Sequence, residues 1–439
     1  MLYRLLKAIV SLGVWLYYRK VKVVNKHYLP EEGPCILIAN HPNTLMDAWI
    51  IGYVSKRPIY FMAKATLFSS PFKQRILRSL NMIPINRRGE GVIPGVSNQD
   101  SFEACYRILE EGKCLLVFPE GTSYLERHLR ELKTGTARIA LEVLRRNENN
   151  VPLKVIPMGL NYMQADRFRS DVLVHIAPPI LPAEYYVANK EEISPAAKRL
   201  TEEFRVRLEH VFVNSAGKEE EELTESLHRI FQSKYMKQEG RGVQGELNRL
   251  KEIRDRISEL SVMQAWKIAE IKQLQEKINW QLERLDIRAD FLDRRFRSRM
   301  FLRQTFTSVL GLLIGLPLFL YGLIHNVIQY KLTDYIVPRV TKDPEYYAPL
   351  AVLIGLISYP VFYLLFLTLF RFLFDLHWIY YLTYFISMPL SGLITYYMNR
   401  YLMHVSLKSR FLFLWFNHKE SLIELKQDRE KLRALLFES

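Results

Sequence analysis

The chain has 439 residues, with 61 lysines and arginines against 46 aspartates and glutamates and a formal net charge of +15. Its apolar residues are bunched, which excludes one uniform globular domain, and an aromatic content of 13% excludes a disordered chain. The three cysteines are an odd set without metal-type spacing. They disfavour a disulfide-built secreted domain and favour a reducing compartment.

Residues 1–20 contain a short apolar stretch, residues 9–18, with basic residues on both sides. No small-residue cleavage site follows, so a signal peptide is disfavoured. The stretch is also short for a membrane span, which takes about 20 residues. We therefore expect a helix that lies in a membrane interface with Trp15 at headgroup level; a transmembrane start is the alternative.

Between residues 21 and 213, short apolar runs alternate with helical patterns. Strands are predicted at residues 35–39, 59–62, 114–118, 153–158 and 172–176. Helices are predicted at residues 46–54, 71–80, 99–111 and 136–146. Strands that alternate with helices favour an α/β domain around one mixed sheet, and a domain of this length can bury an adequate core.

The first of these strands ends at Ala39 and is followed by Asn-His-Pro-Asn-Thr-Leu-Met-Asp, which opens a helix. His41 therefore lies at the carboxyl end of a strand, where open sheets place their sites. Asp47 lies one to two helical turns further on and could accept the Nδ1 proton of His41, which leaves Nε2 free as a base. A capping aspartate beside a hydrogen-bonded histidine is the structural alternative.

Three more polar segments follow apolar runs. Phe-Pro-Glu-Gly-Thr at residues 118–122 offers backbone N–H groups, a hydroxyl and a carboxylate to a ligand. Arg87 and Arg88 offer two guanidinium groups suited to bidentate phosphate binding, although each by itself also fits solvated surface charge. Residues 155–159 contain a proline and a glycine at a strand end.

Residues 218–303 are densely charged and carry apolar residues at alternating steps of three and four, which predicts amphipathic helices. Gly240 and Gly242 are expected to break the region into two arms. The helices could pack on themselves or on the preceding domain. An intermolecular coiled coil, and with it a homodimer, is the alternative.

Three runs without Asp, Glu, Lys or Arg lie at residues 304–330, 346–370 and 376–399, and each is long enough to cross a bilayer. The arginines just before the first run predict a cytoplasmic flank, and the charge-balanced loop at residues 331–345 suits the far side. The basic tail, residues 400–439 with an amphipathic helix, would lie outside after three crossings. Two to three spans are therefore predicted, and one run could be re-entrant.

In this order, the four polar segments resemble the four blocks of the glycerolipid acyltransferase family, which includes lysophosphatidate and glycerol-3-phosphate acyltransferases. The blocks correspond to residues 41–47, 82–87, 118–122 and 155–157, and the resemblance covers residues 21–213. Five residues separate the His and the Asp here, where the commonest family pattern has four. The yeast-type glycerol-3-phosphate acyltransferases look similar in this respect. Because of the added residue, the sequence alone does not decide whether His41 and Asp47 form a hydrogen bond.

The resemblance implies transfer of a fatty acyl group from acyl-CoA or acyl carrier protein to a glycerol hydroxyl, with His41 as the base and Asp47 as its orienting partner. It further implies that Lys64 and Arg87 hold the acceptor phosphate. Glu120, Gly121 and Thr122 would position the acceptor, and Pro157 would shape the acyl pocket. A backbone N–H near Gly121 is expected to stabilise the oxyanion.

No Gly-x-Ser-x-Gly segment occurs, so direct attack by the acceptor is expected. No cofactor is expected, and no metal, because His41 and Asp47 lack a companion at ligand spacing. The basic surplus suits anionic substrates and lipid headgroups better than nucleic acid.

Glycerol 3-phosphate is the preferred acceptor and lysophosphatidate the alternative. A catalytically inactive membrane scaffold is a second alternative of a different class. The sequence lacks an Asn-x-Ser/Thr glycosylation signal and a retention signal, which favours a bacterial inner membrane over the endoplasmic reticulum, with the catalytic domain cytoplasmic.

Overall fold

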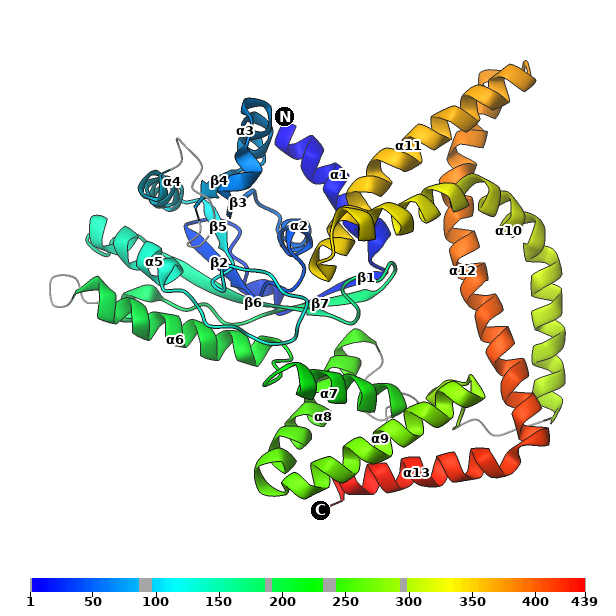
Figure 1. Cartoon of the computed structure of the whole chain (residues 1–439). Coiled ribbons are helices and arrows are strands. Elements are labelled where there is room, and N and C mark those ends of the chain that lie inside the picture. Colours follow the sequence, from blue (N-terminus) through cyan, green and yellow to red (C-terminus); the bar gives the residue numbers. More distant parts are fainter. Residues whose placement is uncertain (1, 87–96, 186–191, 232–241, 293–297, 439) are drawn as a thin grey trace. The chain divides into compact units, whose positions relative to one another are not determined.

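The computed structural model describes the chain except residues 1, 87–96, 186–191, 232–241, 293–297 and 439 (Figure 1). It divides into two compact units. The first unit comprises Met1–Lys218 and Asp343–Val352, and the second comprises Glu219–Lys342 and Leu353–Ser439.

One mixed sheet forms the centre of the first unit. Its strands are β1 (Lys20–Val24), β2 (Cys35–Ala39), β3 (Ile59–Lys64), β4 (Met82–Ile85), β5 (Cys114–Val117), β6 (Lys154–Tyr162) and β7 (Asp171–Ile176). They lie in the order β1-β7-β6-β2-β5-β3-β4, and every pair is parallel except β6 with β7. The prediction of an α/β domain around one mixed sheet is thereby confirmed.

Two strands of this sheet, β1 and β4, were not predicted, and they are its edge strands. β1 carries two lysines in five residues, and β4 contains Pro84. Edge strands tolerate charge and proline because one side of their backbone pairs with nothing. Both strands therefore lack the apolar run that identifies a central strand.

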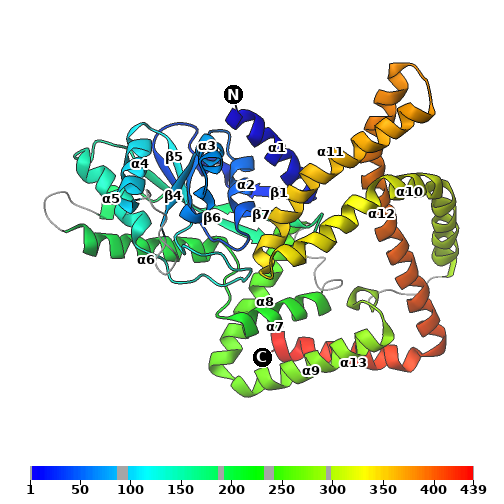
Figure 2. The same cartoon turned by 45° about the horizontal axis from the view of Figure 1, so that its top comes forward.

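Six helices flank the sheet: α1 (Leu2–Tyr17), α2 (Leu45–Val54), α3 (Pro71–Ser79), α4 (Asn98–Glu110), α5 (Gly135–Arg146) and α6 (Ile193–Val211). Four of them were predicted to within one residue at each end. Figures 1 and 2 show α1 and α2 on one side of the sheet and α5 and α6 on the other.

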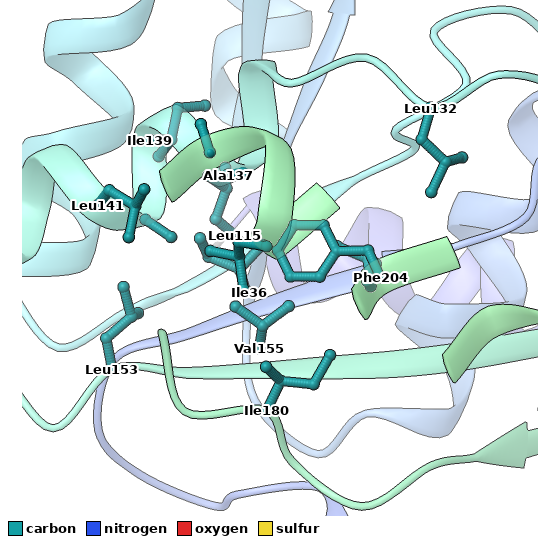
Figure 3. Close-up of a cluster of buried hydrophobic side chains, with 14 of the residues drawn as sticks. Ile36, Leu115, Leu132, Ala137, Ile139, Leu141, Leu153, Val155, Ile180 and Phe204 are labelled. Carbon is teal, nitrogen blue, oxygen red and sulfur yellow. The ribbon is translucent and has the colours of Figure 1, made fainter. Parts of the chain in front are cut away.

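The main core of the first unit lies between the sheet and α4, α5 and α6 (Figure 3). Ile36 and Ile38 of β2 enter this core, because alternate side chains of a strand share a face. Phe204 of α6 is fully buried among them. Burial of a side chain of this kind contributes about 1.5–3 kcal/mol.

The second unit contains a helical bundle of α7 (Lys218–Ile230), α8 (Val243–Met263), α9 (Ala265–Leu285) and α13 (Lys419–Phe437). The apolar stripes of α8 and α9 are buried inside this bundle, as expected for helices that pack on themselves. α8 begins after Gly242, whose φ is +102°, while Gly240 lies outside the described residues. A break at Gln264 between α8 and α9 was not predicted.

The apolar runs lie in three long helices, α10 (Ser298–Val340), α11 (Tyr347–Leu373) and α12 (Trp378–Asn417). Within the described ranges, Leu313–Val340 and Pro344–Leu373 are long and apolar enough to cross a bilayer by length and composition. The third predicted run lies in α12 and is not one of these two. The number of spans stays a prediction.

α10 and α12 pack closely through polar and small residues. The Asn326 side chain donates to the Met388 carbonyl at 3.2 Å, and a Cβ on Gly392 would lie 2.6 Å from Asn326 Oδ1. Small residues at such contacts let two helix backbones approach each other in an apolar setting.

Candidate active site

The carboxyl ends of β2 and β5 lie side by side, because the two strands are parallel and Ile38 pairs with Val117. The loops that follow them are therefore neighbours. The first loop contains His41 and leads into α2, and the second contains residues 118–122. Sheet topology thus brings two of the predicted blocks to one edge.

The hydrogen bond between His41 and Asp47 is present. His41 Nδ1 lies 2.8 Å from Asp47 Oδ2, and the Asp47 side chain is fully buried while that of His41 is 11% exposed. A buried carboxylate at Nδ1 keeps the proton on that nitrogen and leaves Nε2 as the proton acceptor. Among the described residues, no side chain or carbonyl is hydrogen-bonded to Nε2.

Asp47 is held by two further donors. The Asn43 N–H donates to Oδ2 at 2.7 Å, and the Tyr162 hydroxyl donates to Oδ1 at 2.5 Å. Burial, together with the nearby Asp47 charge, raises the pKa of Tyr162 well above its usual value, so this hydroxyl stays protonated. The carboxylate is therefore stabilised by hydrogen bonds in a site that excludes water.

Thr44, in the loop between His41 and Asp47, immediately precedes α2. Its φ of +43° and ψ of −122° lie in a region that β-branched residues rarely adopt. Such a conformation costs about 1–3 kcal/mol and persists only where the surroundings hold it. The Thr44 N–H donates to Ser123 Oγ at 3.0 Å, which ties this residue to the loop after β5.

Thr44 also contacts a distant segment of the first unit. Its hydroxyl donates to the Glu345 carbonyl at 3.0 Å. Glu345, the last residue of the loop at residues 331–345, therefore lies beside the loop that carries His41. The side of the membrane on which residues 331–345 lie stays a prediction. Most of this predicted loop is helical, because α10 continues to Val340.

The loop after β5 supports His41 from a second direction. The ring of Phe118 stacks on the His41 ring with centroids 3.8 Å apart and an interplanar angle of 7°. Glu120 accepts hydrogen bonds from the His41 N–H at 2.9 Å and from the Arg130 N–H at 3.2 Å. Burial raises the pKa of the Glu120 carboxyl. Both oxygens of Glu120 are thus occupied by the protein backbone.

Residues 20–161, about a third of the chain, match the Acyltransferase family model. This domain belongs to the acyltransferase family. A 1-acyl-sn-glycerol-3-phosphate acyltransferase of Borreliella burgdorferi is 27% identical over 31% of the chain and 53% of its own length. Glycerol-3-phosphate O-acyltransferase 1 of Saccharomyces cerevisiae is 28% identical over 30% of the chain and 18% of its own length.

Among solved structures, the acyltransferase domain is similar to the 1-acyl-sn-glycerophosphate acyltransferase PlsC of Thermotoga maritima. The two are 20% identical, and the match covers 47% of this chain and 80% of PlsC with a TM-score of 0.32. The chain spans less than two thirds of the length of the curated relatives named above.

The remaining predicted site residues occupy different places in the acyltransferase domain. Lys64 ends β3, and Pro157 is buried in β6 opposite Ile38 of β2. Thr122 is half-buried beside Gly121. Arg87 lies outside the described residues.

Gly121 has a φ of +76°, and its N–H donates to the Phe118 carbonyl at 3.1 Å. The turn therefore uses this amide, and the expected oxyanion donor near Gly121 is not the Gly121 amide itself. Among the described residues, no three His, Cys, Asp or Glu side chains gather as they would around a metal ion.

Lys133 of the acyltransferase domain was not assigned a role from the sequence. A Cβ on Gly121 would lie 2.6 Å from Lys133 Nζ, so the ammonium group rests against the turn at residues 118–122. The Lys133 N–H donates to the Pro119 carbonyl at 2.9 Å, and the residue is exposed. The sequence signal for it is the run Leu132-Lys133 after the Pro-Glu-Gly-Thr turn, which is similar to the third block of the yeast-type enzymes.

Proposed function

We propose that this protein is a membrane-bound O-acyltransferase that moves a fatty acyl group from acyl-CoA or acyl carrier protein to the hydroxyl of glycerol 3-phosphate. The observation that carries the proposal is the His41–Asp47 pair at a strand end, with Nδ1 bonded to a buried carboxylate and Nε2 left as a base. The family of residues 20–161 supports acyl transfer as the reaction class.

His41 Nε2 takes the proton of the acceptor hydroxyl as the hydroxyl oxygen attacks the thioester carbonyl carbon. The tetrahedral intermediate collapses by breaking the carbon–sulfur bond, and the thiolate leaves with the proton returned by His41. An ester and a thiol are formed. Asp47 stabilises the imidazolium between the two proton transfers, so neither a covalent enzyme intermediate nor a cofactor is needed.

Lys133 gives the acceptor phosphate a counter-ion in this proposal. Its ammonium group lies against Gly121, one residue from Glu120, which holds the His41 backbone. A cation beside the turn that holds the His41 backbone suits an acceptor that carries a phosphate near its hydroxyl. Lys64 and Arg87 keep the phosphate-binding role that the resemblance implies for them. Thr122 keeps its role in positioning the acceptor, and Pro157 keeps its role in shaping the acyl pocket.

The lysophosphatidate alternative is supported by the Borreliella relative, and glycerol 3-phosphate by the five-residue spacing and the yeast relative. The test is a transfer assay on membranes that contain the full chain. Labelled palmitoyl-CoA and palmitoyl-carrier protein are each offered with glycerol 3-phosphate and with lysophosphatidate. Label in lysophosphatidate supports the proposal, label in phosphatidate alone supports the alternative, and no label with any pair supports the scaffold.

We also propose that the chain is an integral membrane protein with a cytoplasmic catalytic domain, in a bacterial inner membrane rather than the endoplasmic reticulum. The two apolar helical segments support integration. One face of α1 supports an interfacial contact, since its exposed apolar side chains recur every three to four residues: Leu2, Leu5, Ile9, Leu12 and Trp15. Self-association stays a prediction that light scattering would test.

A further inference from the structure

Thr44 lies midway between His41 and Asp47, so its backbone conformation sets how the histidine ring meets the carboxylate. Within this loop, Thr44 adopts a φ of +43°. A conformation that is unfavourable for a β-branched residue needs partners outside the loop. The contacts of Thr44 therefore bear on the geometry of the base.

Two such partners hold Thr44. Ser123 Oγ accepts its N–H at 3.0 Å, and the Glu345 carbonyl accepts its hydroxyl at 3.0 Å. Ser123 follows the Pro-Glu-Gly-Thr turn and belongs to the domain matched by the family model. Glu345 is 301 residues from Thr44 in the sequence, far beyond the residues that the family model matches.

Glu345 belongs to the short 3-10 helix η6 (Pro344–Tyr346), at the start of the segment Asp343–Val352 that forms part of the first unit. This segment is packed, since Ala348 is fully buried and Val352 is 6% exposed. Its contribution to Thr44 is a main-chain carbonyl. The path of the backbone at residues 344–346, rather than the glutamate side chain, therefore determines the contact.

We propose that residues 343–352 are a positioning element for catalysis: the Glu345 carbonyl holds Thr44 in its unusual conformation and thereby keeps His41 aligned with Asp47. Thr44 is accordingly a positioning residue, which acts through the pair and touches no reacting atom. This inference rests on the proposed function and extends it to a segment that comprises η6 and the start of α11.

The first test is a double-mutant cycle in the full chain, with kcat and KM measured for acyl transfer. Thr44→Val removes the hydroxyl and keeps the branched shape, and we expect kcat to fall about 3- to 10-fold with KM nearly unchanged, in line with one lost hydrogen bond. Thr44→Ser keeps the hydroxyl and should restore kcat to within about twofold.

Pro344→Gly frees the φ of the residue that opens η6, and we expect a similar fall in kcat. If both changes act through one contact, the double variant should be no slower than Thr44→Val alone. Thr368→Val is the matched control, because its hydroxyl also donates to a carbonyl, that of Leu364 in α11, far along the chain from Thr44. Its kcat should equal that of the wild type.

The second test does not depend on activity. Thr44→Cys combined with Glu345→Cys should form a disulfide on mild oxidation, because the two positions are in contact. The two single variants, and the wild type with its buried Cys35, Cys105 and Cys114, are the controls. Cross-linking together with non-additive kcat losses supports the proposal. If the wild type transfers acyl groups but the kcat losses of the two variants are additive, or if no cross-link forms, the positioning role is overturned and the proposed function stands. A wild type that transfers to no acceptor overturns the proposed function and the positioning role with it.

Discussion

At the scale of single residues, the candidate base His41 depends on the Asp47 carboxylate. No arginine or lysine is among the hydrogen-bond partners described for this carboxylate. Asp47 accepts hydrogen bonds from His41, Asn43 and Tyr162 while it is fully buried. A charge that is buried with several donors is stabilised in one geometry and strongly penalised in any other. This arrangement fixes the tautomer of His41 without drawing on a second charged side chain.

Replacement of His41 by alanine should lower kcat for acyl transfer by at least about 100-fold, since the acceptor hydroxyl loses its base. His27→Ala, a change at an exposed histidine of the same domain, should leave kcat unchanged. The kcat for transfer from a labelled acyl donor is measured for the purified wild-type and variant chains. A His41→Ala enzyme within tenfold of the wild type would exclude this histidine as the base.

Lys133→Gln should raise KM for glycerol 3-phosphate about tenfold, because an ion pair with the acceptor phosphate is lost, while KM for the acyl donor stays the same. Lys133→Arg keeps the charge and should recover much of the affinity. Lys198→Gln, a change at an exposed lysine of α6, is the control. If KM for the donor rose instead, Lys133 would bind the phosphates of the donor.

At the scale of secondary structure elements, β6 is anchored by its contact with the end of α6. A Cβ on Gly159 would lie 2.1 Å from the Val211 carbonyl oxygen, so the strand and the helix backbone touch directly. Asn161 reinforces the contact by donating to the same carbonyl at 2.9 Å. β6 continues to Tyr162, the residue that bonds Asp47.

Gly159→Ala should therefore destabilise the fold by about 3 kcal/mol, since the added methyl group forces two backbones apart. Gly52→Ala is the matched control in α2, where a Cβ meets nothing within 4 Å. It should stabilise the chain by about 0.5–1 kcal/mol, because alanine favours a helix over glycine. Thermal unfolding of the detergent-solubilised chains measures both, and equal midpoints would contradict the packing argument.

At the scale of the whole molecule, the chain combines a basic surplus with long apolar helices whose surfaces are exposed. Ile357 in α11 is 69% exposed, and Leu313 and Ile314 in α10 are 65% and 67% exposed. Exposure of this many apolar side chains to water would be unfavourable in free energy. The exposed faces of α10 and α11 suit contact with lipid.

Ile357→Lys should reduce the fraction of chain that resists alkaline carbonate extraction from membranes, because a lysine near the centre of a span costs about 2.5–3.5 kcal/mol. Val262→Lys changes another highly exposed apolar residue, at the end of α8, and should leave that fraction unchanged. Equal extraction of both variants would argue that α11 lies outside the bilayer.

Local patterns were enough to predict the buried strands β2 and β5, the four helices between strands, and the candidate pair His41 and Asp47. Each of these is encoded in consecutive residues, through an apolar run, a helical period or a short motif. The amphipathic stripes of α8 and α9 were predicted for the same reason. Edge strands β1 and β4 were missed because a strand paired on one side needs no continuous apolar run.

The tertiary structure alone decided the contacts between residues far apart in the chain. Tyr162 reaches Asp47 across 115 residues, and the Glu345 carbonyl reaches Thr44 across 301. It also turned Glu120 inward, so that both oxygens bind backbone amides, and brought Lys133 against Gly121. Composition and periodicity determined which segments fold and what chemistry they carry. Which of these groups meet depends on how strands and helices pack, because partner choice over long distances leaves no periodic trace in the sequence.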